Sequence, residues 1–156
     1  MHPNAALIER LYAAFGDRDG EAMAACYHRD VSFSDPAFGT LTGDRPAMMW
    51  RMLTSRAADL VITASAIQAD DAKGSAHWEA AYTFAATKRK VHNVIDATFT
   101  FKEGLISTQD DVFDFHRWSK QALGAPGYLL GWTRFMQNTV RKRALGELER
   151  FIARRA

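Results

Sequence analysis

The 156-residue sequence predicts an α+β fold, in which N-terminal helices pack in a curved antiparallel sheet and a helical extension follows. Apolar residues recur at helical spacing in the first third of the chain. They alternate with polar residues from about position 60 to 115, and helical spacing returns near the C-terminus. Because helices and strands occupy separate blocks, the order favours an α+β domain over a doubly wound one. We expect one domain over residues 1–156, with the extension over 118–156.

Three helices are expected before the main run of strands. The first begins at Asn4, whose side chain can cap it, and the second is short and spans residues 21–27. The third opens at Asp44, a favourable capping residue, with Pro46 in its first turn. The apolar positions expected to face the core are Leu7, Ile8, Leu11, Tyr12 and Phe15 in the first helix, and Met48, Met49, Met52 and Leu53 in the third.

The strands are expected to form an antiparallel meander, because short turns such as Glu103-Gly104 separate the alternating runs. A short strand through Val31 and Phe33 precedes this run, and a further one begins at Leu60. Three more strands follow, and in each of them alternate residues share one face. These sets are Trp78, Ala80, Tyr82 and Phe84 in the first; Val91, Asn93, Ile95, Ala97, Phe99 and Phe101 in the second; and Gln109, Asp111, Phe113 and Phe115 in the third.

The C-terminal region is expected to start with a loop at residues 124–127. An amphipathic helix over residues 128–154 follows, interrupted near Gly146 because glycine weakens a helix. From Arg134 onward the chain carries seven basic and two acidic residues. Three interpretations of this charge stay open: a solvated face of a packed helix, a weak contact with an anionic membrane surface, or a nucleic-acid contact. No nucleic-acid motif supports the third.

Several function classes are disfavoured by composition. No apolar run reaches the length of a membrane span, and the start of the chain lacks the basic residues of a secretory signal. The single cysteine, Cys26, excludes an internal disulfide and is compatible with a reducing compartment, so we expect a cytoplasmic protein. Metal-binding and nucleotide-binding signatures are absent, and the five histidines are scattered. We therefore expect no metal and no cofactor.

Three segments resemble the NTF2-like superfamily, and within it the SnoaL-like and ketosteroid isomerase-like proteins. These are residues 9–39, the helix opening at 42–49, and residues 92–115. The resemblance covers about residues 5–117 and leaves the C-terminal extension outside. It implies a cone-shaped sheet around a hydrophobic pocket, a small apolar ligand, and a homodimer.

Asp35, in the Ser-Asp-Pro sequence at the end of the first strand, corresponds by this resemblance to the general base of ketosteroid isomerases. Such a base needs a mostly apolar pocket, because desolvation raises its proton affinity towards the working pH. The alternative is a turn residue, since an aspartate before proline commonly bonds the backbone N–H two residues on.

Ketosteroid isomerases stabilise the enolate with a tyrosine on the first helix and an unionised aspartate on the third strand, and this sequence does not match both. Leu11 stands where the resemblance places a tyrosine, and Tyr12 is one residue, or about 100°, further round the helix. Asp96 matches the acidic partner by local sequence, but alternation places it on the outer face with His92 and Thr98. Steroid isomerisation is therefore not supported. Limonene epoxide hydrolase, another relative by fold, uses an Asp-Arg-Asp set in the sheet. By this resemblance Val94, two residues before Asp96, stands where the arginine would be expected, so an epoxide-hydrolase function is only weakly indicated.

Alternation along the strands nominates other polar groups for the pocket, namely Asn93, Gln109 and Asp111. Their alternative role is a satisfied hydrogen bond in the core. The first functional hypothesis is a cofactor-independent isomerase or cyclase acting on a small apolar carbonyl compound, with Asp35 as base and Asp111 or Asn93 orienting the substrate. The second is a non-catalytic ligand-binding or dimerisation module. The side chains expected to contact a ligand are Tyr12, Trp50, Trp78, Tyr82, Asn93, Gln109 and Phe113.

Overall fold

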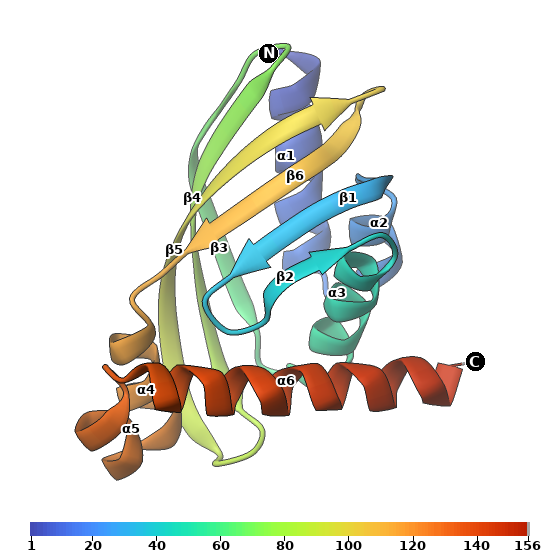
Figure 1. The fold of residues 1–156 in the computed structure, drawn as a ribbon. Helices are drawn as coiled ribbons and strands as arrows, with labels where there is room; N and C mark the ends of the chain where they lie inside the picture. The colour runs from blue at the N-terminus through green and yellow to red at the C-terminus, as the bar shows by residue number, and fades with distance from the viewer. Residues whose placement is uncertain (156) are drawn as a thin grey trace.

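A computed structural model describes residues 1–155 and arranges them as a six-stranded sheet with helices on its concave side and at one end (Figure 1). The strands are β1 (Tyr27–Asp35), β2 (Gly39–Thr42), β3 (Val61–Ala69), β4 (Lys73–Phe84), β5 (Arg89–Lys102) and β6 (Leu105–Val112). The helices are α1 (Pro3–Gly16), α2 (Gly20–Ala24), α3 (Arg45–Arg56), α4 (Phe115–Leu123), α5 (Ala125–Leu130) and α6 (Arg134–Arg155).

The sheet has the order β2-β1-β6-β5-β4-β3, and β3 to β6 form the expected antiparallel meander. The alternation predicted for β5 is confirmed, since Asn93 and Ile95 are buried whereas His92 and Asp96 are exposed. Because a strand turns successive side chains to opposite faces, this pattern fixes which polar groups of β5 and β6 point into the cone.

β1 is longer than the short strand expected through Val31 and Phe33. The expected helix over residues 21–27 ends at Ala24, and Tyr27 already belongs to β1. β1 pairs antiparallel with β2 and parallel with β6, with an irregularity between Tyr27 and Ser32. Pairing of Tyr27 with Ile106, a contact distant in sequence, outweighs the local helical preference.

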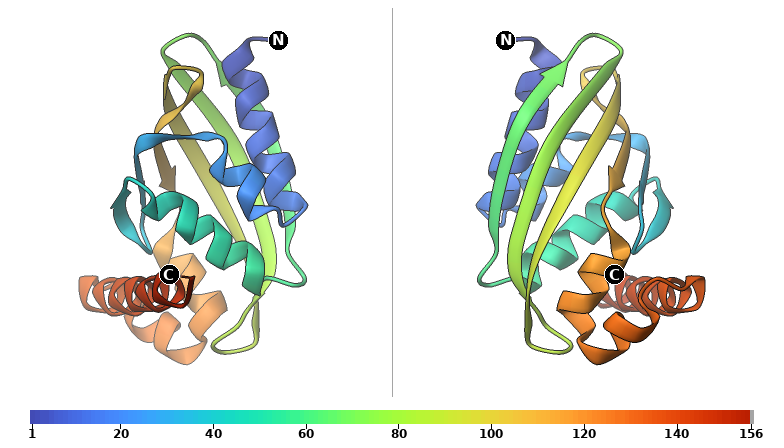
Figure 2. Two further views of the ribbon diagram at one scale, coloured as in Figure 1. Left: turned by 90° about the vertical axis from the view of Figure 1, so that its right-hand side faces the viewer. Right: turned by 90° about the vertical axis from the view of Figure 1, so that its left-hand side faces the viewer.

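Helices α1 and α3 cover the concave side of the sheet, and α1 packs against β3 and β4 (Figure 2). Their apolar faces meet the inner faces of the strands in one core. The large apolar side chains there that are almost completely buried are Leu7, Ile8, Leu11, Met23, Phe33, Met49, Met52, Ile95, Phe99, Ile106 and Leu148. The opposite face of β3, β4 and β5 is turned outward (Figure 2).

The C-terminal region departs most from expectation. The alternating run ends at Val112, and Phe115 begins α4 because Asp114 caps that helix by accepting a hydrogen bond from the Arg117 N–H. The loop expected at 124–127 is largely α5. The helix expected from residue 128 starts only after Gly131, where a Cβ atom would collide with the side chain of Ser119. The interruption expected near Gly146 is absent from α6, which continues through that residue.

Helix α6 crosses one end of the molecule beside α3 (Figure 1). Its Leu148 is fully buried there. Across residues 1–155, none of the helices is both long and apolar enough to span a bilayer.

Candidate functional site

Asp35 ends β1 and is partly buried at the turn towards β2. Its Oδ1 accepts hydrogen bonds from the N–H groups of Ala37 at 2.9 Å and Phe38 at 2.6 Å. Burial raises the pKa of Asp35 to about 6, against the opposing effect of these two N–H groups and of Arg141. Asp35 is therefore both a turn residue and a desolvated carboxyl group, the two roles that the sequence left as alternatives.

Asp111 lies deeper, on the inner face of β6, with 3% of its surface exposed. Burial raises its pKa well above the ordinary value. The Gln109 amide opposes this rise and the charge of Asp35 reinforces it. Gln109 donates to Asp111 Oδ1 at 3.1 Å and accepts from the Tyr27 hydroxyl at 2.6 Å. Burial therefore favours the protonated form of Asp111, which lies within electrostatic range of Asp35.

Three buried donors face the interior and have no hydrogen-bond partner among residues 1–155: the Tyr12 hydroxyl and the indole N–H groups of Trp50 and Trp78. Burial raises the pKa of Tyr12, and Asp111 adds to that rise, so the hydroxyl lies within electrostatic range of Asp111. The Trp78 N–H favours ionisation of Asp111, although its geometry falls short of a hydrogen bond. Buried donors of this kind are ready to bind an acceptor atom.

Tyr12 lies inside the cone, although it is offset by one residue, or about 100°, from the position that the resemblance assigns to a tyrosine. Both Leu11 and Tyr12 are buried, because the concave sheet surrounds more than one face of α1. The Tyr12 ring packs against Trp78 with their centroids 5.6 Å apart.

Aromatic rings occupy the centre of the cone. The Trp50 and Trp78 centroids are 6.4 Å apart in an edge-to-face arrangement. Phe15 and Phe33 pack on Trp50 at 5.0 and 5.5 Å. A ligand that reaches Asp111 through this region must therefore displace Trp50 or Trp78.

Tyr82 lies on the Asp35 side of the interior. Its hydroxyl accepts a hydrogen bond from the Trp118 indole at 2.9 Å, and burial and the charge of Asp35 raise its pKa. Phe113 lies just beyond β6 and packs against both hydrophobic clusters of the protein. Asn93 is buried on β5, opposite Ala80 of β4. The structure thus brings Asp35, Asp111, Tyr12, Trp78 and Tyr82 together around one interior.

Two contributors from α6 were missed by sequence reasoning. The Gln137 amide and the Arg141 guanidinium donate to the Pro36 carbonyl oxygen at 3.1 and 3.2 Å. Arg141 also packs over Gly39, whose φ of +73° and missing side chain leave room for the guanidinium. No local pattern distinguishes Arg141 from the other arginines of α6, and Tyr27 was missed because it was assigned to a helix.

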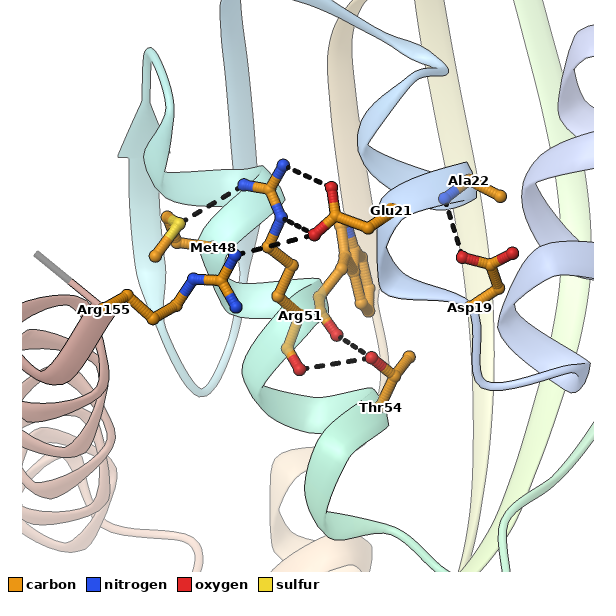
Figure 3. Close-up of polar contacts among 8 residues, drawn as sticks. Asp19, Glu21, Ala22, Met48, Arg51, Thr54 and Arg155 are labelled. Carbon is orange, nitrogen blue, oxygen red and sulfur yellow. Dashed lines mark hydrogen bonds and ion pairs between the residues drawn. The ribbon is translucent and has the colours of Figure 1, made fainter.

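The far end of α6 is fastened to α2 and α3 by ion pairs (Figure 3). Glu21 accepts two hydrogen bonds from Arg51, at 2.8 and 3.0 Å, and lies 3.6 Å from Arg155. Because both ends of α6 are anchored, the helix keeps Arg141 in place beside the Asp35 turn.

Asp96 lies outside the site, as the alternation predicted. It is exposed on the outer face, where its Oδ1 is 2.9 Å from Nδ1 of His77. His77 also contacts Glu79 at 3.1 Å, and Glu79 contacts His92 at 2.7 Å. The acidic group inside the cone is therefore Asp111 on β6, not Asp96 on β5.

Comparisons with known proteins agree with this geometry at the level of the fold. The model of the SnoaL-like domain matches residues 8–109. No curated protein matches the sequence significantly. An NTF2-like protein of unknown function from Burkholderia pseudomallei superposes with a TM-score of 0.67 at 18% identity, over 79% of this chain and 99% of the other.

Two further structures extend the likeness. A protein with a ketosteroid isomerase-like fold from Catenulispora acidiphila, in complex with trimethylamine, has a TM-score of 0.66 at 16% identity, over 81% of this chain and 96% of the other. A candidate polyketide cyclase from a Silicibacter species has a TM-score of 0.62 at 21% identity, over 76% and 94%. The NTF2-like cone expected from the sequence is confirmed.

Proposed function

The chain belongs to the SnoaL-like domain family, and from this premise we propose that it is an isomerase or cyclase that moves a proton on a small apolar carbonyl compound. The observation that carries the proposal is a pair of carboxyl groups in different environments. Burial raises the pKa of Asp35 only to about 6, against the opposing effect of two backbone N–H groups and Arg141, whereas it raises the pKa of the deeper Asp111 well above the ordinary value. Paired groups whose environments separate their pKa values are suited to act as base and acid.

In the proposed reaction, the Asp35 carboxylate removes a proton from the carbon next to the substrate carbonyl. The electron pair of that C–H bond moves to the carbonyl oxygen and forms an enolate. The Asp111 acid and the Tyr12 hydroxyl donate hydrogen bonds to this oxygen. In an isomerisation, protonated Asp35 returns the proton to another carbon of the substrate. In a cyclisation, the enolate carbon attacks a second carbonyl, and the new alkoxide takes the proton.

The remaining interior groups would position the substrate. Gln109 holds Asp111 in place and is itself held by Tyr27. Trp50, Trp78, Tyr82 and Phe113 offer flat apolar surfaces, which favours a planar ligand. Asn93, buried on β5, supplies a further polar group to this interior.

The second candidate function is a non-catalytic ligand-binding module. It is favoured by the packing of Trp50 against Trp78 and Phe33, which fills the centre of the cone. Binding of a planar compound between these rings would need no proton transfer.

The two functions are separated by following deuterium exchange at the α-carbon of planar apolar ketones in D2O by proton NMR. We expect exchange with the wild-type protein and a loss of about 100-fold or more in Asp35→Asn, the usual contribution of a general base. Asp111→Asn should lose about 10-fold, because an amide still donates a hydrogen bond but no longer a proton. Asp96→Asn, on the outer face, is the matched control and should exchange as the wild type does. Binding without any exchange would favour the ligand-binding module.

A further inference from the structure

The junction of α5 and α6 exposes an unusual concentration of apolar side chains. Trp132 and Phe135 are 72% and 71% exposed, and Leu129 is 71% exposed. Contiguous exposed apolar patches of this kind mark interaction sites in folded proteins. We call residues 128–135 the aromatic corner. Its exposed apolar members are Tyr128, Leu129, Leu130, Trp132 and Phe135.

The aromatic corner is an ordered structure whose opposite side is packed. Gly127 and Gly131 approach Ser119 of α4 so closely that neither position has room for a Cβ atom. The Trp132 indole donates to the Leu129 carbonyl oxygen at 3.2 Å, and the Thr133 hydroxyl accepts from the Met136 N–H at 3.1 Å. The backbone therefore fixes these apolar side chains outward.

A row of cationic side chains continues from the aromatic corner along α6. Phe135, Thr139, Lys142, Gly146 and Arg150 follow one another at steps of three or four residues and so share one face of the helix. A hollow on this face is lined by Thr139, Lys142, Arg143, Gly146 and Arg150. We call this surface the basic stripe.

The two acidic residues of α6 do not neutralise this face completely, because both form ion pairs with α3. Glu149 pairs with Arg45, and Glu147 contacts Arg56 at 3.1 Å. Glu147 also lies 3.5 Å from Arg143. The cations of the stripe that form no ion pair in the structure of residues 1–155 are therefore Lys142 and Arg150. The outward face of α6 thus combines an apolar end with a cationic body.

We propose that the aromatic corner and the basic stripe together form a docking surface for an anionic lipid bilayer. The aromatic and leucine side chains enter the headgroup region, where tryptophan and leucine are favoured, and the cations face lipid phosphates. A second copy of the chain fits this surface poorly, because two basic stripes would face each other. Nucleic acid would use the cations but leave Leu129 and Leu130 exposed. The inference does not depend on the proposed reaction.

Co-sedimentation with vesicles tests this proposal. The full chain is mixed with vesicles of phosphatidylcholine alone or of phosphatidylcholine with phosphatidylserine. We expect about tenfold or stronger binding to the anionic vesicles, weakened by salt because the attraction is screened. Trp132→Ser with Phe135→Ser, and separately Lys142→Glu with Arg150→Glu, should each reduce binding about tenfold. Val61→Ser with Val112→Ser, exposed apolar positions on the sheet, should bind as the wild type does.

Fluorescence gives an independent reading, because Trp132 is exposed whereas Trp50, Trp78 and Trp118 are buried. Anionic vesicles should protect Trp132 from an aqueous quencher and shift its emission to shorter wavelength. Equal binding to both kinds of vesicle, or binding unaffected by the Trp132 and Phe135 changes, would overturn the proposal. So would a dimer in light scattering that these two changes abolish, or tight binding to duplex DNA without binding to vesicles.

Discussion

Arg141 donates a hydrogen bond to the Pro36 carbonyl oxygen at 3.2 Å, across 105 residues of sequence. The same guanidinium lowers the pKa of the adjacent Asp35, partly offsetting the effect of burial. The family match ends at residue 109, so a helix outside it influences the proposed base. Helix α6 is therefore part of the electrostatic environment of the site.

Replacing Arg141 with methionine should raise the pKa of Asp35 above about 6, because the favourable charge is removed while the apolar stem is kept. Carboxyl chemical shifts followed by NMR as a function of pH report this pKa. Arg143→Met, on the outward face of the same helix, is the control and should leave the pKa of Asp35 unchanged. An unchanged value in the Arg141 variant would show that the guanidinium does not act on Asp35.

Asp35→Asn should stabilise the protein at pH 7 but not at pH 3. Asp35 binds its proton more tightly in the folded protein, so its contribution to stability is complete below its ordinary pKa of 3.8 and is lost as pH rises through about 6. A shift of two pKa units corresponds to at most about 3 kcal/mol. Asparagine avoids this loss and can still accept from Ala37 and Phe38. Urea unfolding at the two pH values measures the difference, and an equal effect at both would contradict the raised pKa.

Two substitutions at Asp111 should separate a neutral acid from a buried charge. Asp111→Asn should change the free energy of unfolding at pH 7 by less than about 1 kcal/mol, since an amide oxygen still accepts from Gln109. Asp111→Ala leaves that amide without an acceptor and should destabilise by about 1–3 kcal/mol. Denaturant titration of both variants distinguishes a neutral Asp111 from an ionised one. A loss of several kcal/mol in the asparagine variant would indicate an ionised, paired Asp111 instead.

Two tyrosines of the interior form a matched pair for the same assay. Tyr27→Phe removes the 2.6 Å hydrogen bond to Gln109 and should destabilise by about 1–3 kcal/mol, because a buried amide oxygen loses its donor. Tyr12→Phe should be neutral or stabilising in the absence of ligand, since the described part of the chain, residues 1–155, offers its hydroxyl no hydrogen-bond partner to lose. Comparable losses in the two variants would mean that the Tyr12 hydroxyl is satisfied in solution.

The part of the site carried by the sheet could be predicted, because strand alternation is strictly periodic. It placed Asn93 and Asp111 inside and Asp96 outside, and the structure confirms all three. Tyr27 and Arg141 could not be predicted, because their roles depend on contacts 82 and 105 residues away in the chain. The break before α6 depends likewise on the approach of Gly131 to Ser119.

The most direct measurement is an NMR titration of the carboxyl groups of Asp35 and Asp111, with and without a planar apolar ketone and with Asp35→Asn and Asp111→Asn for assignment. We predict that Asp35 titrates near pH 6, that Asp111 stays protonated at neutral pH, and that a ketone that binds shifts at least one of the two. Titration of both groups near pH 4, unaffected by every ketone, would contradict a proton-transfer site in the cone.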